Sequence, residues 1–215
     1  MNSQASAPLK RIADSTVRRL SLYLRFLEEF ETAGLTTVSS GELAARGGTT
    51  SAQVRKDLSF FGSFGKRGLG YQVAELTQRM RRILGLERDW RVIIVGVGKI
   101  GAALAQYEGF RQRGFRVVGL YDADPDKIGR EIYNLPVHAI SALAEDNRES
   151  PVDIAVIAVP AAAAQRAVDD VVAAGILGIM SFAPIQLHVP PEVTINTVNM
   201  AMELERLSYA LSNRG

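Results

Sequence analysis

The second half of the chain alternates short apolar runs with helical segments. Apolar runs rich in Val and Ile occupy residues 91–95, 117–121, 153–159, 176–182 and 193–198. Such runs, bounded by turn residues, are typical of strands buried on both faces of a parallel sheet. An alanine-rich helix is expected at 161–174, ended by Gly175, and residues 137–140 suggest a short extra strand. The alternation predicts an α/β fold with a doubly wound parallel sheet and right-handed crossovers.

The first 85 residues show helical periodicity instead. Val17, Leu20, Leu24 and Leu27 share one face of a helix that we expect to begin near residue 14 and to end at Gly34. A fourth helix is expected where apolar residues recur at helical spacing, at Val73, Leu76, Met80 and Leu84.

Two short helices are expected between these. Ser39 and Glu42 have capping-box spacing, which predicts a helix over 41–46. A glycine turn at 47–48 then precedes a helix over 52–60, capped by one of residues 49–51. Two short helices joined by a glycine turn are typical of a helix-turn-helix unit, whose second helix enters the DNA major groove.

Polar residues at the start of that second helix are the candidate DNA contacts. Val54 and Leu58 should face inward and hold the helix on its domain. The residues then available to bases or phosphates are Ser51, Gln53, Arg55 and Lys56. From these residues alone, an ordinary solvated helix face is an equal alternative.

Residues 61–71 alternate aromatic, glycine and basic residues, and this pattern favours DNA binding. Glycines at 62, 65, 68 and 70 allow a tight hairpin, with Lys66 and Arg67 at its expected tip. A basic tip of this kind suits a winged helix that reaches phosphates or a minor groove. Phe60, Phe61 and Phe64 would anchor the wing, although a stacking surface for single strands is an alternative.

A dinucleotide-binding fingerprint follows the run at 91–95. Gly96, Gly98 and Gly101 have G-x-G-x-x-G spacing, and apolar residues through Tyr107 suggest the helix that should follow. Gly96 permits the turn, Gly98 lets a pyrophosphate approach the backbone, and Gly101 lets the helix pack closely. The alternative is a glycine turn without a ligand. The expected contacts also include Val97, Lys99 and Ile100, together with Val159 and Pro160 from the end of the strand at 153–159.

Asp122 ends the next apolar run, about 20 residues beyond the fingerprint. A carboxylate there accepts hydrogen bonds from the adenosine ribose and repels a 2′-phosphate. The sequence therefore predicts NAD(H) as the cofactor in preference to NADP(H).

Composition excludes several classes of protein. The chain has no cysteine, so disulfides, zinc–thiolate sites and thiol redox sensors are excluded, and we expect no metal. It has no apolar run long enough to span a membrane and no recognisable secretory signal, so we expect a cytoplasmic protein without a membrane partner. Residues 1–89 carry a net charge of +5 and the remainder −3, which suggests a polyanionic partner for the first part.

An enzyme of this fold would need a proton donor beside the nicotinamide. The only histidines are His138 and His188, and neither lies in a motif with a carboxylate or arginine. We therefore expect no enzyme, and a cofactor that acts as a signal, with a small NAD-dependent oxidoreductase as the alternative. The amphipathic segment 199–211 would pack on its own subunit or be exchanged with a second copy.

Four motifs resemble those of the redox-sensing transcriptional repressor Rex family, and the resemblance covers nearly the whole chain. They are SAQVRKDLSFFGSFGKRGLGY at 51–71, GVGKIGAAL at 96–104, YDADPDKIG at 121–129 and FAPIQLHVP at 182–190. The resemblance implies a homodimer of winged-helix and Rossmann domains with a domain-swapped C-terminal helix, which binds palindromic operator DNA and is released by NADH. We expect the winged-helix domain at 1–85, the Rossmann-like domain at 86–198 and the swapped helix at 199–215.

The resemblance also implies a redox switch. An aspartate before the swapped helix is thought to change partners between an arginine of the first helix, here Arg25, and a tyrosine near the nicotinamide, here Tyr107. This chain has Asn199 at the aspartate position, and Met200 where family members are often aromatic or leucine-like. Because asparagine carries no charge to pair with Arg25, a DNA-binding paralogue with a weakened redox response is the further alternative.

Overall fold

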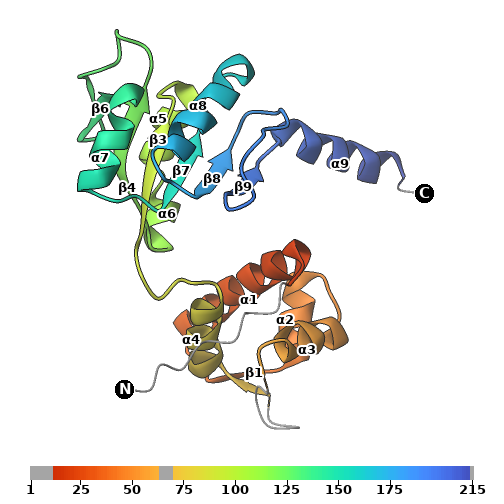
Figure 1. Ribbon diagram of the computed structural model, residues 1–215. Helices are drawn as coiled ribbons and strands as arrows, with labels where there is room; N and C mark the ends of the chain where they lie inside the picture. Colours follow the sequence, from red (N-terminus) through yellow and green to blue (C-terminus); the bar gives the residue numbers. More distant parts are fainter. Residues whose placement is uncertain (1–11, 63–69, 214–215) are drawn as a thin grey trace. The chain divides into compact units, whose positions relative to one another are not determined.

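The computed structural model describes residues 12–62 and 70–213, which form two compact units (Figure 1). Unit 1 is Met1–Arg88 and unit 2 is Asp89–Gly215. The division falls close to the boundary expected after residue 85. Each unit has its own hydrophobic core, so each is described by itself.

Unit 1 is a small helical domain with a short two-stranded ladder. Its elements are α1 (Asp14–Thr32), β1 (Thr37–Val38), α2 (Ser40–Gly47), α3 (Ser51–Ser59), β2 (Tyr71–Gln72) and α4 (Val73–Ile83). Apolar side chains from all four helices form its core, among them Leu24, Leu43, Leu58 and Met80.

The local signals in unit 1 are largely confirmed. Ser39 caps α2 through a complete capping box with Glu42, and Gly48 ends α2 in the left-handed region at φ 58°. Val54 and Leu58 are buried, as expected for the inner face of α3. The inward position predicted for Val17 is wrong, because it is 36% exposed and α1 instead buries Tyr23 beside its leucines.

The two strands of unit 1 form the base of the expected wing. β1 pairs antiparallel with β2, placing Val38 opposite Tyr71. Gly70 has φ 75°, and a Cβ there would lie 2.6 Å from the carbonyl oxygen of Val38, so the wing base requires glycine at this position. The expected tip residues Lys66 and Arg67, and Phe64, lie outside the described residues.

Unit 2 is built on a largely parallel sheet. Its elements before the C-terminal helix are β3 (Trp90–Val95), α5 (Lys99–Ala105), α6 (Glu108–Gln112), β4 (Phe115–Asp122), β5 (Glu131–Ile132), β6 (Leu135–Ala139), η1 (Ile140–Ala142), α7 (Leu143–Glu149), β7 (Ile154–Ile157), α8 (Ala161–Ala173), β8 (Gly178–Ser181) and β9 (Thr194–Thr197). The strands are ordered β5-β6-β4-β3-β7-β8-β9, and the β5–β6 pair alone among these is antiparallel.

Helices cover the sheet from both sides, as the sequence predicts. Alternate residues of β3 face opposite layers. Ile93 and Val95 pack in a core with α7 and α8, whereas Val92 and Ile94 pack in a core with α5. The helix expected to run from the fingerprint through Tyr107 is shorter, because α5 ends at Ala105 and Tyr107 is the N-cap of α6.

The C-terminal helix α9 (Met200–Ser212) lies apart from this core. Figure 1 shows it extending away from β9. All of its described residues are exposed. Its large apolar side chains are each more than half exposed: Met200, Met202, Leu204, Leu207, Tyr209 and Leu211.

Candidate functional site

The loop between β3 and α5 needs each of its glycines for a different reason. Gly96 has φ 94°, and a Cβ there would lie 2.5 Å from Cγ1 of Val159. A Cβ on Gly101 would lie 1.9 Å from the carbonyl oxygen of Gly96, so the start of α5 packs directly on the loop. A Cβ on Gly98 would meet no protein atom within 4 Å among the described residues. Gly98 therefore faces open space, as the approach of a pyrophosphate requires.

The start of α5 is open to a ligand. Gly98 is the N-cap residue of α5, and no described side chain makes a capping hydrogen bond to the first N–H groups of this helix. Lys99 and Ile100 follow on the exposed side of the loop. The first N–H groups of a helix have no acceptor within the helix, so they are free to bind an anion.

Asp122, at the end of β4, holds this loop in place. It is 8% exposed, and its Oδ2 accepts from the N–H of Val97 at 2.7 Å and from Nζ of Lys127 at 3.1 Å. Its Oδ1 accepts from the N–H of Asp124 at 2.9 Å. Burial by itself raises the pKa of Asp122, but these hydrogen bonds outweigh burial and hold the pKa below its ordinary value. The carboxylate is therefore ionised at neutral pH. Of its roughly four lone-pair positions, three are occupied by these donors, which leaves about one for a ribose hydroxyl.

Lys127 is a member of this cluster that the sequence reasoning did not single out. Besides Asp122, its Nζ lies 3.4 Å from Oδ2 of Asp124. The hydrogen bond to Asp122 raises the pKa of Lys127, so the lysine stays charged. Val97, expected to contact the cofactor, is buried and uses its N–H on Asp122, so it fixes the loop.

The other predicted cofactor residues lie at or near the same ends of the strands. Val159 follows β7 and lies against Gly96, and Pro160 is the N-cap of α8. Tyr107 is 59% exposed and meets the ring of Phe110 edge-on, with ring centroids 5.2 Å apart. A Cβ on Gly109 would lie 2.6 Å from the Tyr107 ring, so the ring can occupy this position only because residue 109 is a glycine.

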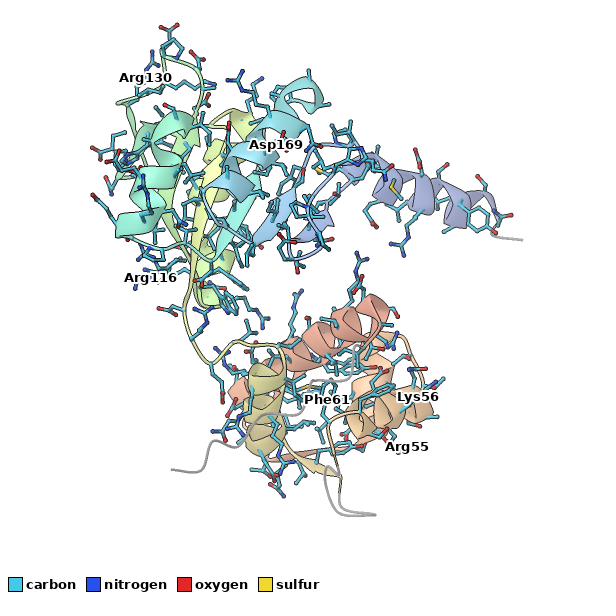
Figure 2. The ribbon with its side chains drawn as sticks, in the orientation of Figure 1. Arg55, Lys56, Phe61, Arg116, Arg130 and Asp169 are labelled. Carbon is cyan, nitrogen blue, oxygen red and sulfur yellow. The ribbon has the colours of Figure 1, made fainter. Side chains whose placement is uncertain are left out.

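In unit 1, α3 presents charged side chains at its surface. Arg55 and Lys56 point outward from α3 in Figure 2. Arg55 donates from Nη1 to Oγ of Ser40 at 3.0 Å, which links α3 to α2. Ser51 is the first residue of α3, and Thr50 caps it by accepting from the N–H of Gln53 at 3.2 Å.

Gln53, predicted as a DNA contact, is also tied into the domain. Its Nε2 donates to Oδ1 of Asp57 at 2.8 Å. Asp57 is 0% exposed and also accepts from Nε and Nη2 of Arg19, at 2.7 and 2.8 Å, and from the hydroxyl of Tyr23 at 3.1 Å. Sequence reasoning missed this network, since Arg19 and Asp57 are 38 residues apart and no local spacing joins them.

The three predicted switch residues lie on three different helices or their caps. Arg25, on α1, has Nε 3.5 Å from Oε1 of Glu29. Tyr107 precedes α6, as described above. Asn199 is the N-cap of α9, and its Oδ1 accepts from the N–H groups of Ala201 and Met202 at 3.0 and 3.3 Å. Because Asn and Asp cap helices about equally well, asparagine preserves the local structure here.

His138 lies near a carboxylate that no motif of the sequence reveals, whereas His188 is held through its backbone. Nδ1 of His138 lies 3.6 Å from Oδ2 of Asp146, which also accepts from the Tyr121 hydroxyl at 2.9 Å. The backbone N–H of His188 donates to Oε1 of Gln165, and its carbonyl oxygen accepts from Nε2 of Gln165, each at 2.9 Å. Within residues 12–62 and 70–213, no cluster of three acidic or histidine side chains could hold a metal ion. No helix in those ranges is both long and apolar enough to cross a bilayer.

Comparison with known proteins agrees with this division of the chain. Residues 11–59 match the family described as putative DNA-binding protein N-terminus. Residues 87–185 match the family described as CoA binding domain. The first segment falls in unit 1. The second falls in unit 2, apart from residues 87 and 88.

Relatives match over nearly the full length. The redox-sensing transcriptional repressor Rex of Carboxydothermus hydrogenoformans is 48% identical over 93% of this chain and 96% of its own. RSP, a Rex-family repressor, solved with beta-NAD+ and operator DNA, matches with a TM-score of 0.89 at 36% identity over 94% of this chain and 93% of its own. RSP solved with beta-NADH matches with a TM-score of 0.85 at 34% identity over 94% and 95% of the two chains. The chain therefore belongs to the Rex family of redox-sensing transcriptional repressors.

Proposed function

We propose that this chain represses transcription by binding operator DNA through unit 1 and that NADH, bound by unit 2, releases it. One observation carries the proposal. A repressor seen with NAD+ and operator DNA matches 94% of this chain, so both units are matched together. The similar proteins are named transcriptional repressors, and the chain is a regulator and not an enzyme.

NAD(H) is the cofactor, since the matching repressor is seen with both of its redox forms. Within the site, we assign the pyrophosphate to the open side of Gly98 and to the N–H groups that begin α5 at Lys99 and Ile100. Asp122 would accept from the adenosine ribose. The nicotinamide would lie toward Tyr107, whose exposed ring is free to contact it.

Double-stranded DNA would be bound by α3 and the wing. The first turns of α3 would enter the major groove, where Arg55 and Lys56 contact bases or phosphates. Ser51 and Gln53 lie in the same turns. The antiparallel pair β1–β2 would support the wing, as in a winged helix. Such a protein acts where the chromosome lies, so we propose a cytoplasmic location.

A homodimer is proposed from two apolar surfaces that unit 2 leaves uncovered. One is α9, whose leucine, methionine and tyrosine side chains are exposed. The other is a groove of about 310 Å³ on the sheet, lined largely by apolar residues that include Phe110, Phe115 and Met180. Contiguous exposed apolar surfaces are typical of protein–protein interfaces. A second copy that exchanges α9 would cover such surfaces and would present two α3 helices to a palindromic operator.

The redox signal then requires coupling between the two units. NADH would bring the two subunits closer and move the α3 helices away from their half-sites. NAD+ opposes this change only if it binds the two states with affinities different from those of NADH. Asn199 supports a second candidate, a DNA-binding family member with a weakened response, because the asparagine lacks the charge that would pair with Arg25.

The division of labour is tested by Arg55→Ala. Loss of the guanidinium should weaken operator binding about tenfold, because charged contacts to bases or phosphates are removed. NADH affinity, measured by fluorescence titration, should not change. Equal loss of both affinities would contradict the assignment of the two functions to two units.

A further inference from the structure

The carboxylate of Asp57 determines which end of the Gln53 amide, the NH2 group or the carbonyl oxygen, faces it. Asp57 is fully buried and receives donors from Arg19, Tyr23 and Gln53. Burial raises the pKa of Asp57, but the hydrogen bonds from Arg19, Gln53 and Tyr23 outweigh it and leave the pKa below its ordinary value. Burial and the hydrogen bond to Asp57 raise the pKa of Tyr23 to about 12, so Tyr23 remains a donor.

An ionised carboxylate accepts hydrogen bonds and cannot donate them. Only the NH2 end of the Gln53 amide can therefore face Asp57, and the structure has Nε2 at 2.8 Å from Oδ1. The carbonyl oxygen Oε1 must then point away from Asp57. Within the described residues, Oε1 has no hydrogen-bond donor. Gln53 is half-buried, and its own N–H is held by Thr50, so both its backbone and its side chain are fixed.

We propose that Asp57 is a positioning residue that fixes the Gln53 amide so that Oε1 is the atom offered to the major groove. The inference rests on the proposed role of α3 in DNA binding. An unrestrained glutamine can present either its NH2 group or its carbonyl oxygen. It can therefore pair with base edges that carry acceptors or with base edges that carry donors. Gln53, held in this way, selects a base with an exocyclic amino group, which is N6 of adenine or N4 of cytosine.

The arrangement also connects base selection to the domain core. Arg19 belongs to α1, and its two hydrogen bonds to Asp57 are the bidentate kind that fixes geometry best. The orientation of the amide is thus set by contacts between α1 and α3. Arg55 is held by Ser40 and Lys56 is exposed, so the Asp57 network orients Gln53 and not these two residues.

The test uses the full-length protein and a duplex selected from a randomised library by the wild-type chain. In that duplex, each adenine is replaced in turn by purine, which lacks the 6-amino group, and each cytosine by its 4-deamino analogue. We expect one position in each half-site where loss of the amino group weakens binding about five- to tenfold. Gln53→Met should bind the unmodified and the modified duplex equally.

Asp57→Asn is the second variant in the test. Its neutral amide can offer Gln53 either a donor or an acceptor, so the Gln53 amide is no longer held in one orientation. This variant should lose the preference for the amino group at the Gln53 position while keeping the preferences at other positions. Thermal unfolding controls for its fold. If Asp57→Asn does not fold, Gln53→Met, which leaves Arg19 and Tyr23 on Asp57, still tests whether Oε1 reads an amino group, as the proposed orientation requires.

Three outcomes are distinguishable. If wild-type protein selects no duplex, the proposed DNA-binding function fails. If it selects one and Gln53→Met keeps every base preference, DNA binding stands and the role of Gln53 is overturned. Dependence of the Gln53 position on a base carbonyl, and not on an amino group, would likewise overturn the proposed orientation.

Discussion

The N–H of Val97 donates to Oδ2 of Asp122 at 2.7 Å, which joins the glycine loop after β3 to the end of β4. The two residues lie 25 positions apart in the chain. A hydrogen bond to a charged acceptor is stronger than a neutral one. Asp122 therefore shapes the glycine loop. Under the proposed function this loop would receive the pyrophosphate, and the charge of Asp122 would face the ribose.

Replacing Asp122 should weaken cofactor binding more than it weakens the fold. Asp122→Asn removes the charge, and its NH2 group must face the donors of Val97, Lys127 or Asp124. We expect NADH affinity to fall at least about tenfold, measured by fluorescence titration. Asp124→Asn is the matched control, because it removes a charge beside Lys127 and leaves Val97 paired. Equal effects of the two substitutions would contradict the special role of Asp122.

Alanine at two of the fingerprint glycines should separate binding from folding. Gly98→Ala places a methyl group where no described protein atom lies within 4 Å, so we expect stability within about 0.5 kcal/mol of wild type and a large loss of NADH affinity. Gly101→Ala places a Cβ 1.9 Å from the Gly96 carbonyl oxygen, so it should cost about 1–3 kcal/mol or more of stability. Thermal unfolding and NADH titration of both proteins check this. Normal NADH binding by Gly98→Ala would show that the pyrophosphate does not lie there.

The free energy of unfolding of unit 1 should depend on pH through the ionisation of Asp57. Its folded-state pKa is depressed, so it contributes stability above its ordinary pKa of 3.8, and this stability is lost as the pH falls through the folded-state value. At neutral pH, Asp57→Asn should be less stable than wild type by about 3 kcal/mol. The difference should shrink as the pH falls below 3.8. Denaturant unfolding at several pH values measures it, and a difference that is constant with pH would contradict an ionised Asp57.

Asn199→Asp should strengthen the redox response without disturbing α9. Asp caps a helix as well as Asn does, so the hydrogen bonds to Ala201 and Met202 should persist. The new charge supplies the group that the family resemblance pairs with Arg25. We expect a larger ratio of operator affinities in NAD+ and NADH than in wild type. Asn199→Ala is the control, since it loses the cap as well and should not increase the ratio.

Much of the fold could be predicted from local patterns. The short apolar runs that became β3, β4 and β7 can be recognised along the chain, and the capping box of Ser39 and Glu42 lies within four residues. The three glycines of the fingerprint each take the geometry expected from their spacing. These features depend on neighbours along the chain, which a sequence displays directly.

Other features depend on contacts between distant residues or on very short elements. β1 and β5 are too short to show alternation. The Arg19–Asp57 pair joins two helices, and no local spacing reveals it because the residues are 38 positions apart. The Gln53–Asp57 contact, by contrast, has the i,i+4 spacing of a helix. Lys127 joins Asp122 only because the loop after β4 turns back on itself. Val17 lies outward, and α1 buries Tyr23 beside its leucines instead.

Operator affinity measured with NADH and with NAD+ tests the central claim most directly. The full-length protein would be titrated onto a fluorescent palindromic duplex by anisotropy, at fixed salt, with each form of the cofactor added separately. We predict that NADH releases the DNA, whereas NAD+ does not. Tight binding that is indifferent to both forms, from a protein shown to bind NADH, would contradict the redox switch.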